Sequence, residues 1–199
     1  MRFTYTQSLI DKAFTYQQYR RQIDEQLAKA DTTDPKEEAY LQYTKLNVQR
    51  MKRLDKTVKL SDELQQAITT TKSCTWLVLT EGWCGDAAQA NPIFNLIAAA
   101  SAGKIQLRFL LRDANPELMD QHLTNGSRSI PKLIVLNDNF EELASWGPRP
   151  ATLQNLITEW KSNPNLNKTE WIEKAQAWYI ADATKSTQKE LAQLILSYS

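Results

Sequence analysis

Cys84 stands in the short string Trp83-Cys84-Gly85-Asp86-Ala87, between an apolar run and a stretch with helical spacing. A cysteine at the start of a helix has its sulfur near unpaired backbone N–H groups and near the positive end of the helix dipole. Both stabilise the thiolate, so the pKa of this thiol is expected below its free value of about 8.5. The sequence therefore predicts that Cys84 is a nucleophile.

Charged residues elsewhere could modify this chemistry. The negative charge of Asp86 opposes a thiolate, yet carboxylates also occupy first helical turns for capping alone, and the sequence leaves both roles open. Four arginines could border the site, although exposed and solvated positions are the default for arginine. They are Arg108, Arg112, Arg128 and Arg149.

Cys74 is the only other cysteine in the chain. It lies at the opposite end of the predicted strand, on the order of 20 Å from Cys84 at about 3.3 Å per residue. A disulfide needs Cα atoms within about 7 Å, so we reject an internal bridge. Cys74 is expected to be a small buried hydrophobe.

Composition excludes several classes of protein. The 24 basic and 23 acidic residues give a net charge of +1, which argues against nucleic-acid or membrane-surface binding. We find no apolar segment of signal-peptide type and none that could span a bilayer. With two cysteines and one histidine, His122, neither a disulfide scaffold nor a metal cluster is expected. His122 is expected to be structural, no metal or other cofactor is predicted, and a cytoplasmic location is the simplest interpretation.

Residues 1–72 read as a helical extension without a strand signal. Asp34-Pro35-Lys36-Glu37 is a strong helix start, and Ser61 begins another helix. The helix after Asp34 is expected to turn Ala39, Tyr43, Leu46 and Leu54 toward a partner element.

The pattern changes at Ser73, where strands and helices begin to alternate. Strands are predicted at 75–80, 104–111, 132–136 and 141–146, and helices at 86–102, from 115, and at 152–161. This order predicts an α/β sandwich at 73–163, in which helices flank a central mixed four-stranded sheet. Residues 164–199 form a second helical extension, with a capping box at Thr187-Gln188-Lys189-Glu190. Trp160, Trp171 and Trp178 are expected to be packing residues.

Over residues 73–161 the sequence resembles the thioredoxin superfamily, whose active site is Trp-Cys-x-x-Cys at a strand–helix junction. Pro92 lies eight residues after Cys84, at the position of the family's kinking proline. Ser129-Ile130-Pro131-Lys132 precedes a strand, as the family's cis-proline loop does, and Gly147 follows the hairpin. The resemblance implies a thioredoxin-like sandwich with a thiol site at Cys84.

The chain departs from the family at two positions that serve the same half-reaction. Ala87 stands where the resolving cysteine is expected, and Val78 stands where thioredoxins keep a buried acid. Cys84 could therefore attack a disulfide but could not resolve the mixed disulfide within its own motif. The resemblance further implies that Trp83 shapes the surface beside the thiol, and that the backbone of Ile130 pairs with an extended substrate. Lys132 would come close to Cys84 and offset Asp86. The site-shaping set is Trp83, Gly85, Asp86, Ala87, Ile130, Pro131 and Lys132.

Two functions of different classes follow from this resemblance. The first is a cytosolic monothiol thiol–disulfide oxidoreductase, which would exchange with a protein thiol or disulfide partner, or with a small external thiol. The second is a non-catalytic thioredoxin-fold adaptor whose helical extensions bind a protein. A shared iron–sulfur cluster on Cys84 has weaker support, because the paired glycines of glutaredoxins are absent. A peroxide-reducing role lacks the Thr/Arg constellation of peroxiredoxins.

Overall fold

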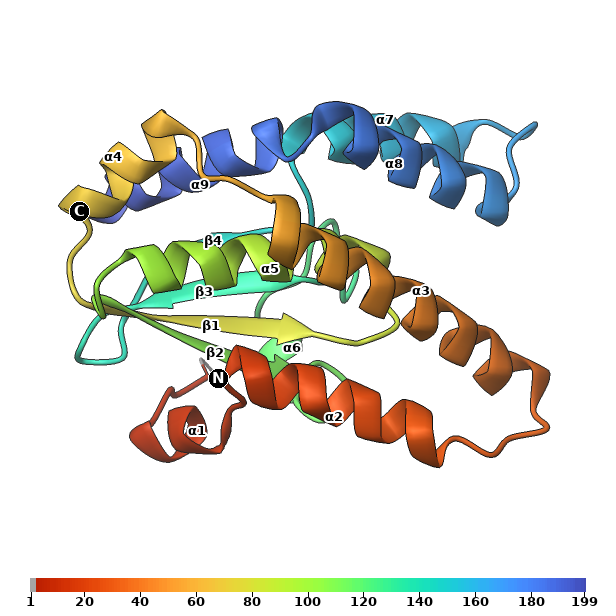
Figure 1. Cartoon of the computed structure of the whole chain (residues 1–199), viewed down its shortest axis with the longest axis horizontal. Helices are drawn as coiled ribbons and strands as arrows, with labels where there is room; N and C mark the ends of the chain where they lie inside the picture. The colour runs from red at the N-terminus through yellow and green to blue at the C-terminus, as the bar shows by residue number, and fades with distance from the viewer. Residues whose placement is uncertain (1–2) are drawn as a thin grey trace.

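The computed structural model describes residues 3–199, in which one four-stranded sheet carries helices on both faces (Figure 1). The strands are β1 (Cys74–Thr80), β2 (Ile105–Leu111), β3 (Lys132–Leu136) and β4 (Glu142–Trp146). The helices are α1 (Gln7–Lys12), α2 (Tyr16–Lys29), α3 (Pro35–Thr57), α4 (Asp62–Thr70), α5 (Gly85–Ala100), α6 (Pro116–Asp120), α7 (Ala151–Ser162), α8 (Lys168–Asp182) and α9 (Lys185–Tyr198).

The strands lie in the order β2-β1-β3-β4, with β2 parallel to β1 and the other pairs antiparallel. This arrangement confirms the predicted α/β sandwich with a mixed sheet. The apolar run of β1 is continuous because the strand is central and buried on both faces. Trp76 and Val78 belong to the larger core, on the side of α3, α4, α5 and α9, whereas Leu77 and Leu79 belong to a smaller core closed by α1 and α6.

Helices from both terminal extensions take part in the larger core. α3 packs along α5, and α9 packs on α4 and β4, so segments far apart in the sequence lie side by side (Figure 1). The predicted domain boundaries at 72/73 and 163/164 stay a prediction. Within residues 3–199, no helix is both long enough and apolar enough to cross a membrane.

The predicted buried face of α3 is wrong for most of the residues that we expected there. Tyr43 and Leu46 are 37% and 47% exposed, and Ala39 is exposed as well. The buried residues are Thr44, Asn47, Val48, Met51 and Leu54. The amino-terminal half of α3 extends beyond the end of the sheet, so its apolar side chains have no core to enter (Figure 1).

The predicted capping box of α9 is also wrong. The helix begins at Lys185, so Thr187 lies inside it and is buried. The Glu190 carboxylate instead accepts hydrogen bonds from the Trp146 indole N–H and the Ala151 backbone N–H, each at 2.7 Å. Glu190 therefore places its negative charge at the amino-terminus of α7, where the helix dipole favours it.

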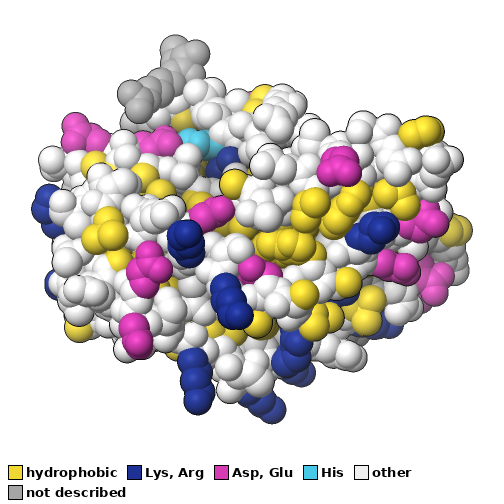
Figure 2. Space-filling view, turned by 90° about the horizontal axis from the view of Figure 1, so that it is seen from above, with side chains coloured by type: hydrophobic (Ala, Val, Ile, Leu, Met, Phe, Trp, Pro, Cys, Tyr) yellow, Lys and Arg dark blue, Asp and Glu magenta, His cyan; other side chains and the backbone are white. Residues whose placement is uncertain are grey.

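α7 and α8 pack on each other through a third, smaller core. It contains Leu153, Ile157, Ala175 and Tyr179, with Trp160, Trp171 and Trp178 partly buried against it. The expectation that these tryptophans are packing residues is confirmed. Figure 2 looks onto α7, α8 and α9 and shows hydrophobic side chains gathered in a band on the half of this face where α7 and α8 lie.

Candidate functional site

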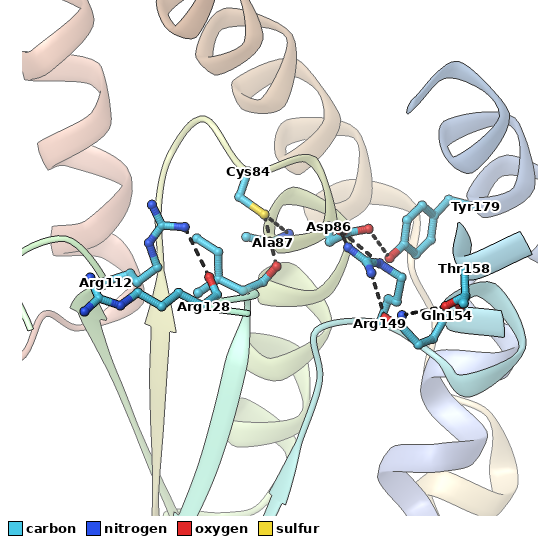
Figure 3. Close-up of polar contacts among 10 residues, drawn as sticks. Cys84, Asp86, Ala87, Arg112, Arg128, Arg149, Gln154, Thr158 and Tyr179 are labelled. Carbon is cyan, nitrogen blue, oxygen red and sulfur yellow. Dashed lines mark hydrogen bonds and ion pairs between the residues drawn. The ribbon is translucent and has the colours of Figure 1, made fainter. Parts of the chain in front are cut away.

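Cys84 is the N-cap residue of α5, at the junction that the sequence predicted. Its Sγ accepts the backbone N–H of Ala87 at 3.5 Å and donates to the carbonyl of Ile130 at 3.2 Å (Figure 3). The peptide bond between Ile130 and Pro131 is cis. The thiol therefore lies between the start of α5 and the cis-proline loop, and the structure brings together Cys84, Ala87, Ile130 and Pro131.

The pKa of the Cys84 thiol differs in direction from the sequence prediction. Burial, and after it the charge of Asp86, raise this pKa to about 12, although the N–H groups of Ala87 and Asp86 and the charge of Arg149 act in the opposite direction. The predicted helix N–H contacts exist, but only 8% of the residue is exposed. Because burial penalises the charged form more than these contacts favour it, the resting site holds a neutral thiol.

Asp86 is held by two residues from outside its own helix. Arg149 donates from Nη2 at 2.5 Å and from Nε at 3.1 Å, and the Tyr179 hydroxyl donates at 2.8 Å (Figure 3). The Asp86 and Arg149 side chains are only 14% and 12% exposed. This buried pair, tied to α8 through Tyr179, neutralises the acid beside the thiol.

The predicted role of Lys132 is wrong. Its Nζ donates to Thr124 Oγ1 at 2.8 Å and to the Gly147 carbonyl at 3.1 Å, and Arg149 takes the expected place beside Asp86. A buried ammonium needs oxygen partners, and the loop before β3 and the end of β4 supply them. Burial lowers the pKa of Lys132, and the charge of Glu142 opposes part of this shift.

Two glycines allow the close packing around the thiol. Gly147 has φ +112°, and a Cβ there would lie 2.2 Å from the Pro131 carbonyl oxygen. A Cβ on Gly85 would lie 2.9 Å from Nε2 of Gln176, on α8. Gly147 thus lets β4 pass directly beside the cis-proline loop, and Gly85 lets α8 approach the start of α5.

Gly147→Ala is expected to lower the free energy of unfolding by about 3–4 kcal/mol, because the left-handed backbone alone costs about 1–2 kcal/mol and the methyl must also displace the Pro131 carbonyl. Gly103→Ala is the matched control, since Gly103 has φ +86° and a Cβ added there would meet no atom within 4 Å. It should cost about 1–2 kcal/mol. Chemical denaturation measures both, and equal losses would show that contact with the cis-proline loop is unimportant.

A groove of about 330 Å³ opens above Cys84. It lies between α3, the Cys84 loop, the cis-proline loop and α8. Trp83 forms one wall, with the Tyr40 ring at 5.4 Å between centroids and the Arg112 guanidinium 4.8 Å from its ring. These three residues also line a second hollow of about 690 Å³ beside the groove. Trp83 therefore lines the same groove as the thiol, and its predicted role in shaping the surface beside Cys84 stays a prediction.

Several groove residues come from elements far away in the sequence. Tyr40 and Arg50 lie on α3, and Trp171 and Gln176 lie on α8. Neither Tyr40 nor Arg50 was singled out from the sequence, and a signal existed only for Tyr40, which lies one turn before Tyr43 on α3. Of the four arginines considered, Arg112, Arg128 and Arg149 line the groove, and Arg108 instead donates to the Leu107 carbonyl.

The remaining candidate residues lie outside the groove. Cys74 is a free thiol at the first position of β1 and is 3% exposed, so it is the small buried residue that we expected. His122 Nε2 lies 2.8 Å from the Tyr5 hydroxyl and 3.7 Å from Glu142. In the part of the chain that the structure describes, no group of three or more His, Cys, Asp or Glu side chains is placed to hold a metal ion.

Comparisons with known proteins give a consistent result. A family model described as thioredoxin matches residues 34–161. A protein of unknown function from Pseudomonas aeruginosa, PA1234, has a similar structure with a TM-score of 0.61 at 14% identity, covering 98% of this chain and 100% of its own. An HIV epitope scaffold gives a TM-score of 0.63 at 13% identity with the same coverage. No curated protein matches the sequence.

Proposed function

The chain belongs to the thioredoxin family, and from this premise we propose that it works as a monothiol, forming a mixed disulfide at Cys84 with a partner held in the groove. The observation that supports this most is the position of Sγ, between the Ala87 N–H and the carbonyl before cis-Pro131, at the floor of an open groove. Ala87 occupies the position of the family's second cysteine; it is fully buried and carries no thiol.

The chemistry has two exchange steps. Cys84 first loses its proton and attacks one sulfur of a partner disulfide, so the Cys84–sulfur bond forms as the partner S–S bond breaks. The leaving thiolate takes up a proton. Cys84 is thereby oxidised to a mixed disulfide, and the released half of the partner is reduced to a thiol. A small external thiolate then attacks the partner sulfur of the mixed disulfide, so a new disulfide forms between the external thiol and the partner half as the Cys84–sulfur bond breaks, and the released Cys84 thiolate takes up a proton. A reducing compartment such as the cytoplasm would supply that thiol.

A second candidate is a non-catalytic adaptor, and the protonated resting thiol favours it. A neutral thiol is a poor nucleophile, because the thiolate is the reacting form. The groove wall combines Tyr40, Trp83 and Arg112, the residue types enriched in protein interfaces. In this case Cys84 would contribute to binding through its shape and its hydrogen bond to Ile130.

Reaction with glutathione disulfide, followed by intact-protein mass, separates the two functions. We expect a single adduct, lost in Cys84→Ser and retained in Cys74→Ser. Because the Cys84 pKa is raised, the thiolate fraction should increase about tenfold per pH unit, so the rate should climb from about pH 7 to pH 10 without a plateau. A plateau near neutral pH would contradict the raised pKa. An absent adduct in the folded protein would leave the adaptor as the function.

A further inference from the structure

Arg50 is a half-buried cation that lines the groove together with Cys84. Its Nη1 donates to Asn47 Oδ1 at 2.8 Å, and Asn47 Nδ2 donates to the carbonyl of Gly82 at 3.0 Å. Asn47 is fully buried, so it links the guanidinium to the loop that carries the thiol. A Cβ on Gly85 would lie 3.8 Å from Nη1, which places Arg50 beside the start of α5.

The groove holds more positive than negative charge. Its charged residues are Arg50, Arg112, Arg128, Arg149, Lys168 and Asp86. Three of the arginines already have carboxylate partners: Arg112 pairs with Asp113, Arg128 with Asp120, and Arg149 with Asp86. No described residue places a carboxylate within ion-pair distance of Arg50 or Lys168. A partly desolvated guanidinium without a counter-ion is costly, so a bound anion would stabilise it.

We propose that the groove is an anion-recognition site, in which Arg50 binds a carboxylate that the ligand carries close to its sulfur. The guanidinium presents several N–H donors that match a carboxylate, and the positive end of α5 adds to the attraction. Trp83, Tyr40 and Trp171 contact the apolar remainder of the ligand. That the ligand bears sulfur rests on the proposed function; the carboxylate preference does not.

Binding to the full-length Cys84→Ser protein tests this site without any thiol reaction. The probes are two rhodamine-labelled octapeptides with a central serine, flanked by glutamate in one and by glutamine in the other. Fluorescence anisotropy should show the glutamate peptide binding at least about tenfold more tightly, as a charge-assisted hydrogen-bonded pair allows. Added salt should weaken only the glutamate peptide.

Arg50→Gln should reduce the preference to less than about twofold, because the charged partner of the carboxylate is gone. Arg53→Gln is the matched control, since Arg53 lies one turn further along α3, is exposed, and does not line this groove. Thermal unfolding confirms that each variant is folded. Equal affinities of the two peptides, or equal losses in the two variants, would overturn the proposal.

S-Methylglutathione as a competitor distinguishes the two sources of such a ligand. Displacement of the glutamate peptide that depends on Arg50 identifies a small acidic thiol, and no displacement identifies an acidic protein segment; both support the carboxylate site. Failure of the proposed function is a separate result. If Cys84 forms no adduct but the glutamate preference persists, the protein is an adaptor that has the anion site. If Cys84 forms the adduct but the two peptides bind equally, the proposed function holds and only the anion site is rejected.

Discussion

Arg149→Gln should lower the free energy of unfolding by about 3–5 kcal/mol, a cost typical of breaking one partner of a buried ion pair. Asp86 and Arg149 are 14% and 12% exposed, so water cannot replace the lost guanidinium. Tyr179 would still donate to the carboxylate, but a hydroxyl carries no compensating charge. Urea denaturation of the variant and the wild type measures the difference.

Two controls make this prediction specific. Arg128→Gln removes a 2.7 Å ion pair with Asp120, but those side chains are 52% and 47% exposed, so its loss of stability should be much smaller than that of Arg149→Gln. The double variant Asp86→Asn, Arg149→Gln replaces both charges with neutral amides and should recover most of the stability. A loss in Arg149→Gln that matches Arg128→Gln, or no recovery in the double variant, would contradict a buried pair.

Local sequence signals were sufficient for the sheet and for the position of the thiol. The strand predicted at 132–136 has the bounds that the structure gives, and β1 begins one residue before the predicted 75–80. The cis-proline at Pro131 came from the family resemblance, and the structure has it. Each of these features is signalled by residues that are close together in the sequence, such as the continuous apolar run of β1 or the proline directly before β3.

Interactions between distant residues could not be predicted in this way. The pKa of Cys84 is set by how deeply α5 and the cis-proline loop bury it, and this burial reverses the effect of the helix terminus. Asp86 finds its hydroxyl partner 93 positions later, in Tyr179. Lys132 donates its hydrogen bonds to oxygen atoms of Thr124 and Gly147 and does not approach the thiol as predicted. Each outcome depends on which helices pack against the sheet, and the sequence indicates helices without fixing their contacts.

Ala87→Cys should convert the monothiol site into a dithiol site. Ala87 is the third residue of α5, and its N–H already contacts Cys84 Sγ at 3.5 Å. In a first helical turn the two Cα atoms lie about 5–6 Å apart, a separation that suits a disulfide. Intramolecular resolution should then accelerate turnover at least about 100-fold over resolution by external thiol, since oriented neighbouring groups have very high effective concentrations. A disulfide-reduction assay measures this turnover.

Ala87→Ser is the control, because a hydroxyl fills similar space without forming the bond, and its turnover should match that of the wild type. The variants are made with Cys74→Ser, so that any bridge found by mass after mild oxidation joins positions 84 and 87. Val78 supplies no buried carboxylate to accept the proton of the new thiol, so turnover should rise steeply with pH. A variant that remains reduced, or that oxidises only to a dimer, would show that the second thiol cannot reach Cys84.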